Sequence, residues 1–183
     1  MADEHTPHRF VVSAILDLPF GRGRTWLSKL PAWSEALFGG WTLAAIATLA
    51  SGQPVNLSVQ GNPSNTGNPD RPDVVGDWHL TESQRSLERW FNTAAFVANR
   101  LYTYGNAGRN ILVAPGTHQF DLGVHKSFRL GERVRLEFRT EAFNAFNSPN
   151  FGAPNAQVGN PAFGRISSAD RPRNMQFGLK TVF

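Results

Sequence analysis

The sequence of 183 residues predicts an all-β protein, an antiparallel meander of about five to six strands with long loops and minor helix. Segments of about ten residues alternate between apolar and polar side chains, which is the period of a β-strand. Chain breakers are frequent, with 17 Gly and 12 Pro, and charged residues make up only 17%. Cysteine is absent, which excludes disulfide frameworks, thiolate metal sites and a cysteine nucleophile.

The first two strands are expected at residues 9–18 and 41–51, joined by a segment with a short helical turn at residues 31–38. A period of two places the apolar side chains of each strand on one face. These side chains are Phe10, Val12, Ala14, Leu16 and Leu18 in the first strand and Trp41, Leu43, Ala45, Ala47 and Leu49 in the second.

The third and fourth strands are expected at residues 118–130 and 132–143, with a tight hairpin at Leu130-Gly131-Glu132. The fourth strand alternates most clearly. Its apolar face holds Val134, Leu136 and Phe138, and its polar face holds Arg133, Arg135, Glu137, Arg139 and Glu141. In the third strand, Phe120, Leu122, Val124 and Phe128 lie opposite Asp121, His125 and Arg129.

The last strand is expected at residues 174–183, where Met175, Phe177, Leu179 and Phe183 alternate with polar residues. Long connections precede the third and last strands, at residues 52–117 and 144–173. The first of these contains one expected helix at residues 82–91, because Thr81 and Gln84 have the spacing of a capping box.

The rhythm of the connections is typical of a transmembrane β-barrel. Structureless loops beyond about 12–15 residues are rare in compact soluble domains, whereas membrane barrels alternate short turns with long outer loops. In such a barrel the apolar face meets lipid and the polar face meets the interior. Five strands cannot close, because the smallest barrels have about eight, so the chain is expected to be a barrel fragment.

Other classes of site are weakly supported. The five histidines lack metal-ligand spacing, the FGRGRT segment lacks the rest of a phosphate loop, and Arg alternates with Glu in the fourth strand rather than forming a nucleic-acid-binding stripe. We therefore expect no catalytic site, metal, cofactor or nucleic acid, and hence no enzyme. Arg135, Glu137, Arg139 and Glu141 are expected to be charges that pair in a watery barrel interior.

The aromatic residues of the long loop, Trp78, Trp90, Phe91 and Phe96, could stack on a sugar or polymer, but packing within the loop is favoured, since a long ordered loop needs its own small core. The first nine residues are polar and no apolar signal region follows them, so no signal peptide is expected in this chain. The apolar run at residues 36–50 is too short for a membrane helix of about 20 residues.

Several segments carry a resemblance to a known family. They are RFVVSAILDLPFGRG, GWTLAAIATLASGQP, RWFNTAAF, GNAGRN, QFDLGVHKSFR, RVRLEFRTEAFNAFNSPNF and residues 164–183. In this order they resemble the C-terminal end of Oar-like TonB-dependent outer-membrane receptors, the type that contains a carboxypeptidase-regulatory-like domain. The resemblance implies that residues 1–183 form the C-terminal segment of the β-barrel.

The last eight residues, QFGLKTVF, resemble the assembly signal of outer-membrane barrels. Gln176, Gly178 and Phe183 match it, whereas Thr181 stands where an apolar residue is usual. We expect the glycine to let a neighbouring backbone approach. We expect the terminal aromatic ring to anchor the strand end at the membrane interface.

The resemblance implies a parental function in solute uptake through a plugged barrel of about 22 strands. The implied partners are the remaining strands and plug of the parent receptor, outer-membrane lipid, the barrel-insertion machinery and, through N-terminal parts outside this chain, an energy-coupling complex. The implied location is the cell outer membrane. The chain is not expected to be active alone.

The alternative from another class is a soluble or surface β-rich binding or structural protein, including a filament-forming one. It would use the loop at residues 52–117 to hold a polymer and would pack its apolar strand faces as a sandwich. Open strand edges favour the filament form. Solubility without detergent distinguishes the sandwich from the barrel fragment.

Overall fold

The computed structural model describes residues 5–29, 31–130 and 133–183. The chain divides into two compact units, which we call the strand unit and the loop unit. The strand unit comprises Phe10–Leu49, His118–Pro149 and Arg171–Phe183. The loop unit comprises Ala50–Thr117 and Asn150–Asp170 with the N-terminal residues up to Arg9. Each unit is described by itself.

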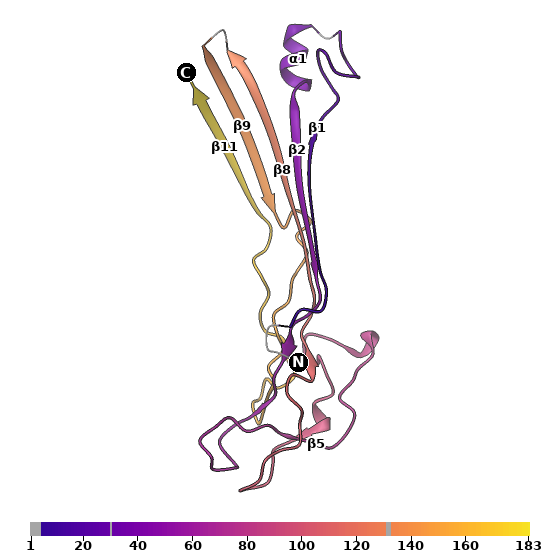
Figure 1. Ribbon diagram of the computed structural model, residues 1–183, viewed down its shortest axis with the longest axis vertical. Coiled ribbons are helices and arrows are strands. Elements are labelled where there is room, and N and C mark those ends of the chain that lie inside the picture. Colours follow the sequence, from indigo (N-terminus) through magenta and orange to yellow (C-terminus); the bar gives the residue numbers. More distant parts are fainter. Residues whose placement is uncertain (1–4, 30, 131–132) are drawn as a thin grey trace. The chain divides into compact units, whose positions relative to one another are not determined.

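The strand unit contains one five-stranded sheet (Figure 1). Its strands are β1 (Arg9–Asp17), β2 (Trp41–Ala50), β8 (Thr117–Leu130), β9 (Val134–Phe143) and β11 (Asn174–Val182). They lie in the order β1-β2-β8-β9-β11, so each pairs with the next long strand along the chain. This antiparallel meander confirms the predicted fold class, and the strands begin and end within one or two residues of the expected ranges.

The strand register keeps the two faces of the sheet separate. Residues directly opposite each other in neighbouring strands point to the same side. Phe128 lies opposite Leu136, and Leu179 lies opposite Phe138, so these apolar side chains share one face. On the other face the opposed pairs are His125 and Arg139, Gln176 and Glu141, and Lys180 and Glu137.

The apolar face of the sheet is exposed. Phe177 and Leu179 of β11 have 70% and 68% of their surface accessible, and Phe10 and Leu16 of β1 have 61% and 57%. A sandwich, the arrangement required by the alternative interpretation, would bury these side chains. Strand β1 departs from the expected alternation, because Ile15, on its other face, is also apolar and 79% exposed.

One end of the sheet carries the connection from β1 to β2 and the connection from β8 to β9. The helix α1 (Ala32–Phe38), predicted at residues 31–38, lies there together with the C-terminus (Figure 1). Strands β8 and β9 stay paired up to Leu130 and Val134 at the same end. The tight hairpin predicted at Leu130-Gly131-Glu132 includes two residues that lie outside the described residues.

The loop unit folds around its own small core. The buried residues of this core are Leu57, Phe91, Ala95, Phe96, Ala107 and Leu112, and Trp78 and Trp90 pack against them. The rings of Phe91 and Phe96 meet edge to face at 5.8 Å. The expectation that the aromatic residues of the long loop pack within it is therefore confirmed.

Short two-residue strands tie the loop unit together. Strand β3 (Pro54–Val55) pairs with β7 (Leu112–Val113), and β5 (Asp73–Val74) pairs with β6 (Phe96–Val97). Strand β4 (Ser58–Val59) pairs in parallel with β10 (Gln157–Val158) and so joins the two long connections. Gly105 is required at a close approach of two backbones, because a Cβ there would come within 2.0 Å of the Arg71 carbonyl oxygen.

The prediction of a helix at residues 82–91 is wrong about its length. Only the 3₁₀ turns η1 (Glu82–Gln84) and η2 (Thr93–Ala95) form. The Thr81 N–H does donate to the Gln84 Oε1, at 3.1 Å, as in a capping box. The helix stops there because Arg85 has an extended backbone and the Ser86 and Arg89 backbones pair with each other, with N–H to carbonyl distances of 3.0 and 3.1 Å. Further along, the Trp90 N–H donates to the Gly164 carbonyl at 2.9 Å. No helix among the described residues is long and apolar enough to cross a membrane.

Candidate functional site

The polar face of the strand unit carries most of the residues that the sequence indicated. Arg135, Glu137, Arg139 and Glu141 alternate along β9 and point to this face, as a period of two requires. Neighbouring strands add residues that were not predicted to belong to this row of charges, although Gln176 was assigned to the C-terminal signature. They are His125 and Ser127 of β8 and Gln176 and Lys180 of β11.

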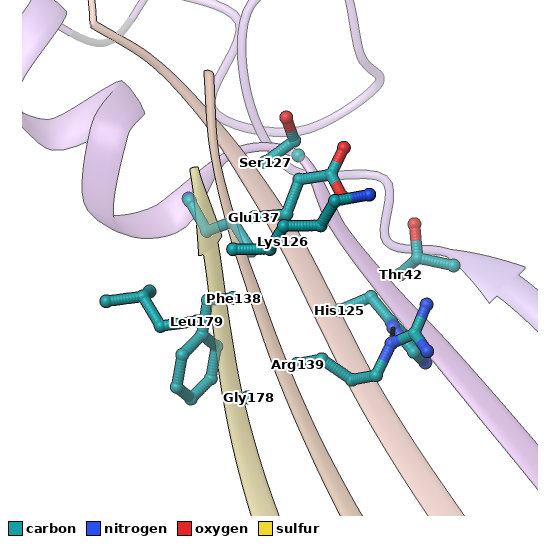
Figure 2. Close-up of a pocket in the computed structure, with 11 residues that line it drawn as sticks. Thr42, His125, Lys126, Ser127, Glu137, Phe138, Arg139, Gly178 and Leu179 are labelled. Carbon is teal, nitrogen blue, oxygen red and sulfur yellow. Dashed lines mark hydrogen bonds between the residues drawn. The ribbon is translucent and has the colours of Figure 1, made fainter. Parts of the chain in front are cut away.

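Polar contacts link three of these strands. The Arg139 Nε donates to the His125 Nδ1 at 3.1 Å, and the two side chains lie beside each other in Figure 2. The Arg139 guanidinium is also 4.0 Å from the Glu141 carboxylate. The Gln176 side-chain amide donates to the same carboxylate. These contacts form a network across β8, β9 and β11 around Arg139 and Glu141.

The rest of the charged face is not paired as the sequence suggested. Arg129 of β8 lies directly opposite Arg135 of β9. Neither arginine forms an ion pair with an acidic side chain among the described residues. Like charges directly opposite each other repel, so this cross-strand pair is unfavourable by itself.

A cavity of about 560 Å³ opens at this network (Figure 2). Its lining includes the side chains of Thr42, His125, Ser127, Glu137 and Arg139, with Gly178 and Lys180 from β11. The lining mixes polar and apolar surface, with Phe138 and Leu179 beside the polar residues, and carries both signs of charge. Such a surface suits water and polar solutes in a barrel interior.

Lys126 was missed by the sequence analysis. It is in phase with Val124 and Phe128, so its side chain lies on the apolar face, yet it is only 4% exposed. Its Nζ donates to the Gly39 carbonyl and lies 4.9 Å from the Trp41 ring centroid and 5.0 Å from that of Phe128. The ammonium group is therefore satisfied by a carbonyl and two aromatic faces. The sequence signal for this residue is that a lysine stands at a position of the strand whose other side chains on that face are apolar.

The residues of the C-terminal signature lie along β11 and just beyond it. Gln176 and Gly178 face the polar side of the sheet, and Phe183 is 92% exposed. The expected close approach at Gly178 is not found, because a Cβ there would meet Arg139 atoms at 3.9 Å, which is ordinary contact. The recognition of these residues by insertion machinery stays a prediction.

A second polar feature lies in the loop unit at Asp70, which is buried. Hydrogen bonds from the Ser64 hydroxyl and the Ser64 backbone N–H hold the pKa of its carboxyl below the ordinary value of 3.8. The backbone bond measures 2.7 Å. Asp70 therefore acts as an ionised anchor for the turn at Ser64 rather than as an acid–base group.

The loop unit also has a small cavity of about 100 Å³ with aromatic walls. Trp78, His79, Arg85 and Trp90 line part of it, the Trp78 and His79 rings being stacked at 4.9 Å. The Arg85 guanidinium lies 5.2 Å from the Trp90 ring centroid. Among the described residues no three His, Asp or Glu side chains are grouped so as to hold a metal ion.

The fold and its two faces define a class of protein. A meander with strands of about ten residues, one apolar exposed face and one charged face is the wall of a membrane β-barrel. Residues 1–176 match the family model of the outer membrane beta barrel domain, and the chain belongs to this family. Its location is the outer membrane. No curated protein and no solved structure matches the chain significantly.

Proposed function

We propose that this chain is the C-terminal barrel portion of an Oar-like TonB-dependent receptor that takes up a solute across the outer membrane. The observation that carries the proposal is that the long loops of this barrel wall are ordered into a unit with a core of its own. Residues 50–117 and 150–170 form one compact unit with a buried core. Ordered outer loops present a fixed surface that can select a solute.

The sheet needs further strands. Its edge strands are β1 and β11, and an open edge in lipid leaves backbone groups without hydrogen-bond partners, at several kcal/mol each. We propose that strands of the parent receptor pair with both edges, that lipid covers the apolar face, and that a plug occupies the polar side. Alone, the chain would not transport.

The test uses the complete gene that encodes this chain, in its own cells. Uptake of a panel of labelled metal chelates, cobalamins, oligosaccharides and peptides is compared in the parent strain, in a strain lacking the receptor gene and in a strain lacking the energy-coupling complex. The proposal predicts that uptake of one solute falls to the same baseline in both deletion strains. Uptake that requires the gene but not the coupling complex would make the protein a passive pore and overturn the proposal.

The second candidate is the surface-binding protein that uses residues 52–117. The observation that favours it is the aromatic cavity of the loop unit with Trp78, His79, Arg85 and Trp90 in its wall. If this candidate is right, cells whose protein carries both changes, Trp78→Ala and His79→Ala, would lose polymer binding. Their uptake of every solute in the panel would be unchanged. Loss of uptake together with binding would instead assign the cavity to transport.

A further inference from the structure

In helix α1, between β1 and β2, large apolar side chains are exposed and a polar one is buried, the reverse of the usual distribution in a soluble protein. On α1, Trp33 and Leu37 are one turn apart and share a face, and they are 69% and 58% exposed. The neighbouring Phe38 is 54% exposed. The polar Ser34 is only 4% exposed, so the helix points its apolar residues outward and a hydroxyl inward.

The inward polar groups of α1 are satisfied by the chain itself. The Ser34 hydroxyl donates to the Pro31 carbonyl at 3.0 Å. The Glu35 carboxylate accepts the Arg22 N–H at 2.7 Å. The Glu35 contact ties α1 to the segment before it, so the outward position of Trp33 and Leu37 is part of the fold. In water an orientation of this kind would be unfavourable, because removing apolar surface from water lowers the free energy.

The exposed apolar side chains continue the apolar face of the sheet. The Trp41 Nε1 donates to the Leu37 carbonyl at 2.8 Å, and the Trp41 ring meets the Phe138 ring edge to face at 6.2 Å. Lys126 of β8 also donates a hydrogen bond to the Gly39 carbonyl, between α1 and Trp41. The surface that begins on β9 with Phe138 therefore runs through Trp41 to α1.

The charges and aromatic residues of the connection fit one environment. Residues 19–40 contain three basic residues, Arg22, Arg24 and Lys29, and one acid, Glu35. Trp26 and Leu27 add exposed apolar surface, at 57% and 48%. Tryptophan with basic residues is the composition that lies at the boundary between lipid headgroups and acyl chains.

We propose that α1 and the connection at residues 19–40 lie in the interface of a phospholipid leaflet, with Trp33 and Leu37 inserted among the lipids. The inference rests on the proposed placement of the apolar sheet face in lipid. It goes beyond solute uptake, because it assigns a membrane-docking role to a connection that is longer than the usual short turn of a barrel. It also explains why a buried lysine fastens this connection to β8.

The test exploits the absence of cysteine, which allows one spin label per single-cysteine variant. The complete receptor that contains this chain, with any cysteine elsewhere in it replaced by serine, is reconstituted in vesicles of phosphatidylethanolamine and phosphatidylglycerol. Collisions of each label with oxygen and with a water-soluble nickel chelate are then measured. The variants are Leu37→Cys on α1, Leu179→Cys on the apolar sheet face and Leu101→Cys, which is 73% exposed in the loop unit. The proposal predicts that labels 37 and 179 have several-fold higher ratios of oxygen to chelate collisions than label 101.

The controls separate the possible failures. If label 179 is in lipid but label 37 collides with the chelate as often as label 101, the docking of α1 is overturned and the barrel placement stands. If label 179 is also in water, the barrel placement falls and the inference with it. If label 37 is shielded from both reagents in native outer-membrane vesicles but open to the chelate in pure lipid, a protein covers α1 and the lipid proposal is wrong.

Discussion

Gln176 and Glu141 lie directly opposite each other on β11 and β9, and the Gln176 side-chain amide donates a hydrogen bond to the Glu141 carboxylate. One residue belongs to the C-terminal signature and the other to the charged row of β9. The contact therefore links the last strand to the polar face, and the Arg139 guanidinium near Glu141 extends that link toward β8.

Loss of the Gln176–Glu141 contact is expected to loosen the last strand. Replacing either residue by Ala should lower the free energy of unfolding by about 1 kcal/mol, the usual contribution of one hydrogen bond near solvent. Urea unfolding of the reconstituted protein measures the effect, with the double variant completing a mutant cycle. A coupling of about 0.5 kcal/mol or more is expected. Strictly additive single effects would show that the contact contributes nothing.

Gly178→Ala is expected to leave the folded sheet intact. A Cβ at this position meets Arg139 at 3.9 Å, and the replacement removes the entropic cost of Gly in a strand, so the free energy of unfolding should rise by up to about 0.5–1 kcal/mol. The same urea unfolding measures it. If assembly in cells falls while this in vitro stability is kept, the glycine is read by the insertion machinery. A loss of in vitro stability would contradict the geometry.

The stability of the loop unit is expected to fall in acid through Asp70. Because hydrogen bonds from Ser64 lower the pKa of this carboxyl in the folded state, its contribution is present above the unfolded pKa near 3.8 and is lost as the pH falls through the lower folded pKa. Hydrogen exchange of the Ser64 amide between pH 6 and 3, corrected for the intrinsic rate, should show declining protection. Asp70→Asn should weaken protection at neutral pH and flatten this dependence. An unchanged profile in Asp70→Asn would remove Asp70 as the anchor.

Lys126→Met is expected to release the connection between β1 and β2. The variant loses the hydrogen bond to the Gly39 carbonyl and the contacts with the Trp41 and Phe128 rings, together about 1 kcal/mol. Limited trypsin digestion should then cleave faster after Arg24 and Lys29. Lys180→Met, which removes an exposed lysine from the polar face, is the matched control and should leave cleavage there unchanged. Equal rates in the two variants would contradict the fastening role of Lys126.

The alternation of apolar and polar residues along the chain was sufficient to predict the long strands and their two faces. The alternation of Val134, Leu136 and Phe138 with charged residues places β9 and its two faces correctly, because side chains of a strand must alternate. Lys126 marks the limit of this pattern, because nothing in the neighbouring sequence indicates that the Gly39 carbonyl would accept a hydrogen bond from its ammonium group.

The loop unit was the least predictable part. The capping signal at Thr81 and Gln84 is real, but the chain becomes extended at Arg85, and the Trp90 N–H donates to a distant acceptor, the Gly164 carbonyl, rather than within a helix. The parallel pairing of β4 with β10 involves strands of two residues, which have no detectable period. The structure of the loop unit is therefore determined by contacts between residues that are far apart in the sequence.

The most direct test of the whole account is a scan of single spin labels along β9, from residue 134 to residue 139, in the reconstituted protein. Labels at 134, 136 and 138 should collide mainly with oxygen dissolved in lipid, and labels at 135, 137 and 139 mainly with the water-soluble nickel chelate. Such a period of two would place one face of the sheet in lipid and the other in a watery interior. A chain that stays dissolved without detergent, with the even-numbered labels shielded from both reagents, would contradict it.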